Sequence, residues 1–160
     1  MKTSHYRVNK LYDKIDISEL AECPGCACFN LRKAARAVTH LYDEILRPTG
    51  IRATQFSLLI ATNLLGPMTV TKLAEQGVMD RTTLTRNLKP LEKLGLIKIS
   101  TGSDQRKRVI SITRKGQEAL VKALPLWRKA QARVVKGLGR KRMESVLKDL
   151  SDVVLLTQNN

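Results

Sequence analysis

Acidic residues are scarce in this chain: 14 Asp and Glu stand against 29 Lys and Arg, which gives a formal net charge of +15. An excess of this size indicates a polyanionic partner, either nucleic acid or, less commonly, an anionic membrane surface. Residues 81–115 carry a net charge of +8, whereas residues 1–80 carry only +2. About half of the excess therefore falls in about a fifth of the chain.

Long apolar runs are absent. No segment has the roughly 20 apolar residues that a membrane span requires, and residues 1–20 lack the apolar core of a signal peptide. We therefore expect a cytoplasmic protein. The three cysteines all lie in CPGCACF, residues 23–29. This number and clustering argue against a secreted disulfide framework, and we expect the thiols to be reduced at rest.

Catalytic and cofactor motifs are also missing. No nucleophile, base and orienting residue form a recognisable set, there is no glycine-rich phosphate loop, and neither histidine has a partner at a useful spacing. These absences argue against an enzyme and against a bound cofactor. With 160 residues, the chain is long enough for one domain, or for two small ones that share a core.

The spacing of apolar residues predicts helices on both sides of the middle of the chain. A long amphipathic helix is expected over residues 30–47, stopped by Pro48. A second is expected from Thr54, its cap, to the stop at Gly66-Pro67. Its predicted inward residues are Phe56, Leu59, Ile60 and Leu64. Two further helices are expected over residues 114–139 and 140–157, where apolar residues again recur at helical spacing.

A helix-turn-helix is predicted between these segments. Residues 68–77 are predicted to form a short helix capped by Thr69. A helix capped by Asp80 is predicted over residues 79–95, MDRTTLTRNLKPLEKLG. Pro90 removes a backbone hydrogen bond and costs ~3 kcal/mol unless the helix bends, so we expect a kink there. One face of this helix carries Leu84, Leu88, Leu91 and Leu94, and the opposite face carries Arg81, Thr82, Thr85, Arg86 and Lys89.

A β-hairpin follows. LIKIS (96–100) and RVISIT (108–113) are β-branched runs, and TGSDQRK between them has turn residues and a basic end. The order of three helices and a hairpin is that of a winged helix-turn-helix, a mainly α fold with a small β wing. We expect an N-terminal segment and helix over 1–48, a DNA-binding lobe over 49–115 and C-terminal helices over 116–160.

This arrangement suits double-stranded DNA. The major groove admits one helix, whose N-terminal residues reach base edges, and a basic hairpin tip suits a narrow minor groove. Asp104 is placed to orient Arg106 by a charge-assisted hydrogen bond. The predicted DNA-binding residues are Thr69, Lys72, Arg81, Thr82, Thr83, Thr85, Arg86, Lys89, Asp104, Arg106, Lys107 and Arg108.

From about Cys28 to Leu155 the sequence resembles the MarR (multiple antibiotic resistance regulator) family of bacterial transcription factors. The resemblance rests on the helix at 79–97 and on SDQRKRVISITRKG, residues 103–116, with its Asp-x-Arg and Thr-x-x-Gly spacing. It implies a homodimer joined through N- and C-terminal helices on a pseudo-palindromic operator, usually a repressor released by a small molecule or by oxidation.

The cysteine cluster resembles part of the organic-hydroperoxide-sensing branch of this family. In that branch a Cys-Phe pair begins the first helix and a Tyr fourteen residues later bonds the thiolate; Cys28 and Tyr42 hold these positions. The helix dipole also favours a thiolate in the first turn. Two further aromatic hydroxyls of that branch are replaced by Arg32 and Ala53. Cys23 and Cys26 are candidate resolving thiols.

Other interpretations of these residues remain open. Cys28 is alternatively a small buried residue, or a zinc ligand together with Cys23, Cys26 and a histidine, His40 or His5. A small-molecule effector, often an aromatic anion in this family, would contact Arg36, His40 and Gln55. For the chain as a whole, the alternative to a specific regulator is a non-specific architectural nucleic-acid-binding protein, whose affinity would not depend on sequence.

Overall fold

The structure is a computed structural model that describes residues 20–102 and 106–158. The chain divides into two compact units, residues 1–38 and 39–160. Within the described residues, no helix is both long enough and apolar enough to span a membrane.

The first unit contains a short 3-10 turn, η2 (Cys23–Gly25), and most of helix α2 (Ala27–Leu46). The helix predicted for residues 30–47 is confirmed, but it begins three residues earlier. Pro48 lies in the next turn, η3 (Arg47–Thr49). Apolar residues of α2 in this unit are exposed: Leu31 is 38% and Val38 is 43% accessible.

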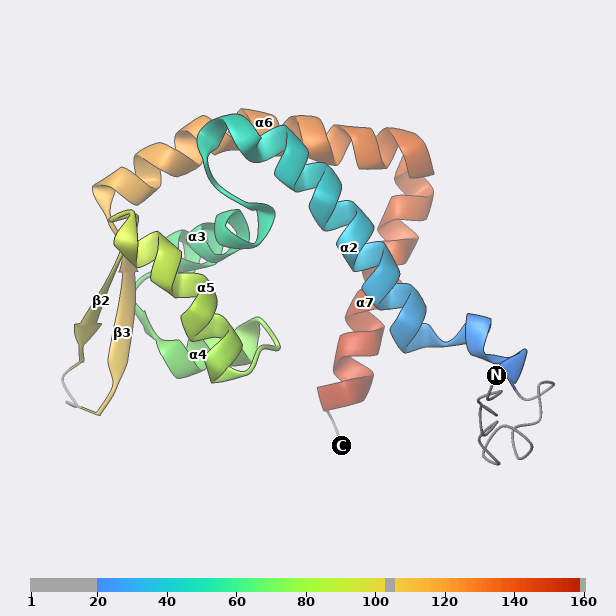
Figure 1. Ribbon diagram of the computed structural model, residues 1–160, viewed down its shortest axis with the longest axis horizontal. Helices are drawn as coiled ribbons and strands as arrows, with labels where there is room; N and C mark the ends of the chain where they lie inside the picture. Colours follow the sequence, from blue (N-terminus) through green and yellow to red (C-terminus); the bar gives the residue numbers. More distant parts are fainter. Residues whose placement is uncertain (1–19, 103–105, 159–160) are drawn as a thin grey trace, which may run out of the picture. The chain divides into compact units, whose positions relative to one another are not determined.

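The second unit is a winged helix-turn-helix, as predicted (Figure 1). Its elements are α3 (Ala53–Leu65), α4 (Val70–Gln76), α5 (Arg81–Lys93), the hairpin β2 (Ile97–Thr101) and β3 (Arg108–Ile112), α6 (Arg114–Leu138) and α7 (Arg140–Gln158). A third strand, β1 (Met68–Thr69), pairs with β3, so the antiparallel sheet has the order β1-β3-β2. The sequence did not predict β1, because two residues are too few to show an alternating pattern.

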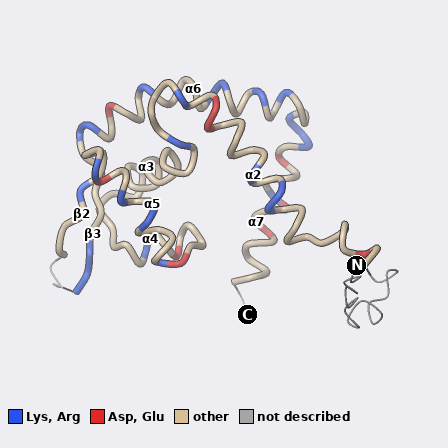
Figure 2. Tube along the Cα trace, in the orientation of Figure 1, with Lys and Arg blue, Asp and Glu red and all other residues tan. Residues whose placement is uncertain are grey.

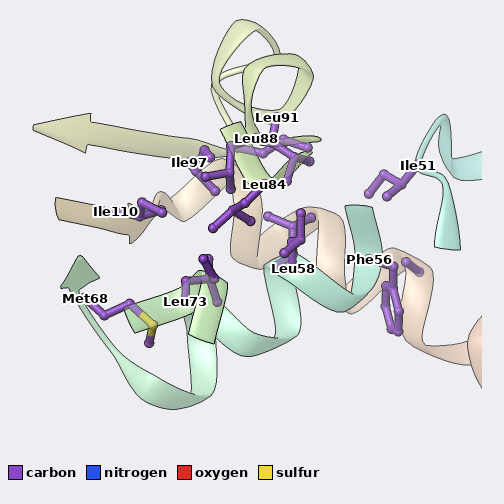
Figure 3. Packing of buried hydrophobic residues seen from close by; sticks show 14 of the residues in the cluster. Ile51, Phe56, Leu58, Met68, Leu73, Leu84, Leu88, Leu91, Ile97 and Ile110 are labelled. Atoms are coloured by element: carbon purple, nitrogen blue, oxygen red, sulfur yellow. The ribbon is translucent and has the colours of Figure 1, made fainter. Parts of the chain in front are cut away.

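The hydrophobic core lies under α5, where Leu84, Leu88 and Leu91 pack with side chains from α3 and the sheet (Figure 3). Two residues predicted to face inward do not. Leu94 is 46% exposed because it follows the last residue of α5, and Leu64 is 75% exposed. The predicted Phe56 and Leu59 are in the core and Ile60 packs against it, and Leu58 and Thr62 are buried as well.

Thr62 is buried, and its hydroxyl is satisfied because Oγ1 donates a hydrogen bond to the Leu58 carbonyl oxygen at 2.7 Å. Periodicity could not single out the buried face of α3, because this helix is apolar around most of its circumference. Neighbouring elements decide which side is covered.

The predicted cap at Thr54 is wrong. Helix α3 begins at Ala53, whose backbone N–H donates to Asp43 Oδ1 of α2 at 2.6 Å. The backbone N–H of Arg52 donates to Gln55 Oε1 at 2.9 Å. Asp43 comes from the preceding helix, so this cap is a tertiary contact that also fixes the end of α2 against α3.

Candidate nucleic-acid interface

Helix α5 is capped as predicted. The Asp80 carboxylate accepts a hydrogen bond of 2.7 Å from the backbone N–H of Thr83. Hydrogen bonds from the Thr83 side chain and backbone hold the pKa of Asp80 below its ordinary value of 3.8, because they favour the charged carboxylate. The helix continues through Pro90 to Lys93 as a single element.

The polar face of α5 is open to solvent. Arg81, Thr82, Thr85, Arg86 and Lys89 are exposed, and Thr83 is half-buried. The leucines of the opposite face anchor the helix in the core. The Thr85 hydroxyl donates to the Arg81 carbonyl oxygen at 2.7 Å, so its proton is used within the helix. An acceptor oxygen and a methyl group remain available for a ligand.

Helix α4 precedes α5 across a strained turn. Thr69 caps α4 as predicted, with Oγ1 accepting from the Lys72 backbone N–H at 3.2 Å. Val78, in the turn between the helices, has a φ of 48°, which is rare for a β-branched residue. The Met79 N–H donates to the Ala74 carbonyl oxygen at 2.9 Å, and this bond helps to hold the turn in that conformation.

The wing is a regular hairpin whose far end is basic. Strands β2 and β3 pair from Ile97↔Ile112 to Thr101↔Arg108, and the Gly102 N–H donates to the Lys107 carbonyl oxygen at 2.8 Å. Arg106, Lys107 and Arg108 are exposed there. Asp104 lies outside the described residues, so its predicted bond to Arg106 stays a prediction.

Strand β1 connects the two halves of this lobe. Met68 pairs with Ile110 and Thr69 with Val109, so the residues that begin α4 are fixed beside the returning strand of the wing. In Figure 1, α4, the N-terminal end of α5 and the hairpin tip lie on the same side of the lobe, away from α6. Figure 2 shows Lys and Arg along α5 and at the tip end of β3. The structure thus gathers the described members of the predicted DNA-binding set.

Thr113 and Gly116 hold the junction between the wing and α6, a role that the sequence did not predict. The Thr113 hydroxyl donates to the Gly95 carbonyl oxygen at 2.7 Å, and Thr113 Oγ1 accepts from the Gly116 N–H at 3.1 Å. One side chain therefore caps α6 and also holds the turn that follows α5. The Thr-x-x-Gly spacing was the available signal for it.

The cysteine segment precedes and begins α2. Cys28 is the second residue of the helix, near the helix start that the family resemblance implied for it, and all three thiols are free and exposed. The alternative interpretation, that Cys28 is a small buried residue, is therefore wrong. Asn30 Nδ2 donates to the carbonyl oxygens of Pro24 at 2.7 Å and Cys26 at 2.9 Å, which ties the segment to the first turn of α2.

Cys28 and Tyr42 are not brought together within one chain. Both lie on α2, and fourteen residues of helix span about 21 Å. The Tyr42 hydroxyl instead donates to Gln131 Oε1 on α6. Burial raises the pKa of Tyr42 above its ordinary value of 10.0, because it disfavours the phenolate.

Two of the three candidate ligand residues, Arg36 and His40, lie one turn apart on α2, and the third, Gln55, lies on α3. His40 is exposed and lines a shallow hollow with Asp43, Arg47 and Arg52. The Gln55 Oε1 atom accepts the hydrogen bond from the Arg52 backbone N–H at the start of α3. Among the residues that the structure describes, no three His, Cys, Asp or Glu side chains are grouped so as to hold a metal ion.

Comparisons with known proteins agree with this geometry. The model of the MarR family matches residues 51–109. The organic hydroperoxide resistance transcriptional regulator of Bacillus subtilis is 33% identical over 100 residues, which cover 62% of this chain and 68% of that protein. An uncharacterised HTH-type regulator of Bacillus subtilis, YwoH, is 27% identical over 88 residues, 55% of this chain and 64% of its own length.

A solved structure covers more of the chain. The Mycobacterium tuberculosis transcriptional regulator MosR, in complex with DNA, is 40% identical and superposes with a TM-score of 0.77. The alignment covers 84% of this chain and 97% of that one.

Proposed function

Because this chain belongs to the MarR family of transcriptional regulators, we propose that it is a homodimeric repressor that leaves its operator when an effector acts on it. The family and the fold establish a sequence-specific DNA-binding regulator. Regulators of this family are not enzymes. The dimer, the direction of control, the effector and the residues that carry each role are proposed below.

We propose that α5 enters the major groove and that the wing enters the adjacent minor groove. Arg81 and Arg86 are exposed at the N-terminal part of α5, where a guanidinium can bond the two acceptors of a guanine. Thr82, Thr83 and Thr85 serve phosphates or a thymine methyl. The observation that carries this proposal is the Asp80-capped helix with apolar residues on its buried face and basic residues on its exposed face.

The phosphate contacts come from the surrounding elements. Thr69 and Lys72 at the start of α4, and Lys89 further along α5, fix the register of the lobe on the duplex. Arg106 inserts into the minor groove with Lys107 and Arg108 on the flanking phosphates. Asp104 orients Arg106. Dimerisation is assigned to residues 1–48 and 116–160, and DNA binding to residues 49–115.

The dimer is proposed from apolar surface that one chain leaves uncovered. Helix α7 exposes Val146, Leu147, Leu150, Val153 and Val154 at helical spacing, each about two-fifths to one-half accessible. A stripe of this kind favours association with a second helix. In a two-fold dimer the α5 helices would meet successive major grooves about 34 Å apart, so the operator would be an inverted repeat with that period.

The effector is proposed to be an oxidant that acts on Cys28. Cys28 is exposed in the first turn of α2, where the dipole favours a thiolate. Because Tyr42 of the same chain is about 21 Å away along the helix, any Tyr42 hydroxyl that bonds this thiolate comes from a second copy. Cys23 and Cys26 are the candidate resolving thiols.

Fluorescence anisotropy on DNA from upstream of the protein's own gene tests the proposal, with unrelated competitor DNA present. Reduced and peroxide-treated wild type are compared with Cys28→Ser. We expect tight binding that oxidation abolishes in the wild type and leaves intact in Cys28→Ser. Tight binding indifferent to peroxide would exclude the thiol switch and favour a small ligand. Binding that unrelated DNA removes equally well would favour an architectural protein.

A further inference from the structure

The densest positive charge lies outside the predicted DNA interface. Between Glu118 and Glu144 the chain has eight Lys and Arg residues and no Asp or Glu. They fall on α6 and on the first turn of α7. Figure 2 shows Lys and Arg recurring along α6 and into α7. None of these eight residues belongs to the predicted DNA-binding set.

The lysines of α6 form a regular stripe. Lys115, Lys122, Lys129 and Lys136 are each seven residues apart, nearly two full turns, so they share one side of the helix over about 31 Å. Arg133 joins the same side. We call these five exposed residues the α6 basic stripe. Each lysine but the last directly precedes a buried residue, Gly116, Ala123 or Ala130, so the stripe borders the packed face.

The stripe is not neutralised within the part of the chain that the structure describes. The ion pairs there join Arg114 to Glu118 at 3.2 Å and Lys148 to Asp152 at 3.0 Å. Glu118 lies between Lys115 and Lys122 on the same side of α6 and is paired with Arg114. The four cations beyond it, Lys122, Lys129, Arg133 and Lys136, have no carboxylate among them, so they repel one another, and a bound polyanion relieves that repulsion.

The stripe lies on a helix that is remote from the predicted operator contacts. Helix α6 begins after β3, at the end of the hairpin opposite the Arg106 tip, and a five-residue strand is about 17 Å long. Figure 1 shows α6 on the side of the lobe opposite α4 and the hairpin tip. A straight duplex against α5 and the tip therefore lies away from the stripe.

We propose that the α6 basic stripe binds the phosphate backbone of a second segment of double-stranded DNA. The length of the stripe is close to one turn of B-DNA, about 34 Å, and ammonium groups bind phosphates without reading bases. Single-stranded nucleic acid is disfavoured, because it requires stacking aromatics and Trp127 of α6 is stacked on Phe56, with ring centroids 6.2 Å apart.

A membrane surface is disfavoured as the partner. A helix that lies in the interface needs a free apolar face, and the small residues beside the stripe, Ala123 and Ala130, are buried in this chain. The inference rests on the proposed function in one respect only, that the first DNA segment is an operator held by α5 and the wing.

A bridging assay tests the inference. Full-length protein is loaded on an immobilised operator duplex, and a labelled duplex without operator sequence is offered at fixed salt. The test variant is Lys122→Gln/Lys129→Gln/Lys136→Gln, and the matched control carries Arg at the same three positions. We expect the Gln variant to capture at least tenfold less labelled duplex while its operator affinity stays within twofold. The Arg control should capture as the wild type does.

The salt dependence gives a second readout. Loss of three phosphate contacts should lower the slope of log K against log salt for the second duplex by about 2 to 3. Equal capture by the Gln variant and the wild type would overturn the inference. So would stripe-dependent binding of phosphatidylglycerol vesicles without binding of duplex. If operator preference is absent but stripe-dependent duplex binding persists, the proposed function fails and the inference stands.

Discussion

The backbone of Leu96 leaves no room for a side chain at Gly116. A β-carbon built on Gly116 would lie 2.1 Å from the Leu96 carbonyl oxygen and 2.7 Å from Ile112 Cγ1. This close approach sets the first turn of α6 against the strand that follows α5. The packing of α5, the wing and α6 at this junction therefore requires glycine at position 116.

Gly116→Ala should therefore destabilise the protein by ~1–3 kcal/mol, because overpacking outweighs the gain in helix propensity. Gly137→Ala, in the last turn of the same helix, is the matched control, since nothing lies within 4 Å of its β-carbon. It should be neutral or stabilising by up to ~1 kcal/mol. Urea unfolding followed by circular dichroism measures both. Similar losses in the two variants would contradict the packing described.

The Asp80 cap should make stability depend on acid pH. Because the pKa of Asp80 is lowered in the folded state, its contribution is fully present above the ordinary value of 3.8 and is lost as pH falls through the lowered value. Asp80→Ala should lower the midpoint of thermal unfolding at pH 7, and the difference from wild type should shrink below pH 4. Asp80→Asn, which keeps an uncharged acceptor, should show little of this pH dependence. A difference that stays constant from pH 7 to pH 2 would disprove the assignment.

Much of the fold could be predicted from sequence because its signals are local. The caps at Asp80 and Thr69 and the stops at Pro48 and Gly66 each act within one helical turn. What escaped prediction depends on distant partners: the Asp43 cap of α3 comes from another helix, and β1 exists only because β3 lies beside it.

The candidate site was predictable to the same extent. The exposed basic face of α5 follows from the leucine spacing on the other side. The sequence could not show which group the Tyr42 hydroxyl bonds, because its partner Gln131 lies 89 positions along the chain. It therefore could not show whether Tyr42, on the same helix as Cys28, is available to that thiol. A contact of this kind leaves no trace in local spacing.

Arg86→Ala should cost ~1–3 kcal/mol of operator affinity and relax base preference at one position in each half-site, because a bidentate contact to guanine is lost. Arg106→Ala should weaken binding chiefly through the minor groove and leave that preference intact. Lys98→Ala, an exposed charge on β2, serves as the control and should have a small effect. Competition titrations with single-base operator variants measure all three. Unchanged affinity in both arginine variants would place the DNA face elsewhere.

Leu147→Asp should dissociate the dimer, because it buries an unpaired charge in the proposed α7 interface. Ser145→Asp adds the same charge two residues away, on nearly the opposite side of the helix, and should leave the dimer intact. Sedimentation equilibrium distinguishes the species. A fully dimeric, DNA-binding Leu147→Asp protein would rule out this interface.

The most direct test of a specific dimeric regulator is selection of bound duplexes from a random-sequence pool by the wild-type protein, followed by sequencing. We expect an enriched inverted repeat whose half-sites are centred one helical turn, about 10 base pairs, apart, and loss of the guanine preference in a parallel selection with Arg86→Ala. Enrichment of no motif, or of a motif without two-fold symmetry, would contradict it.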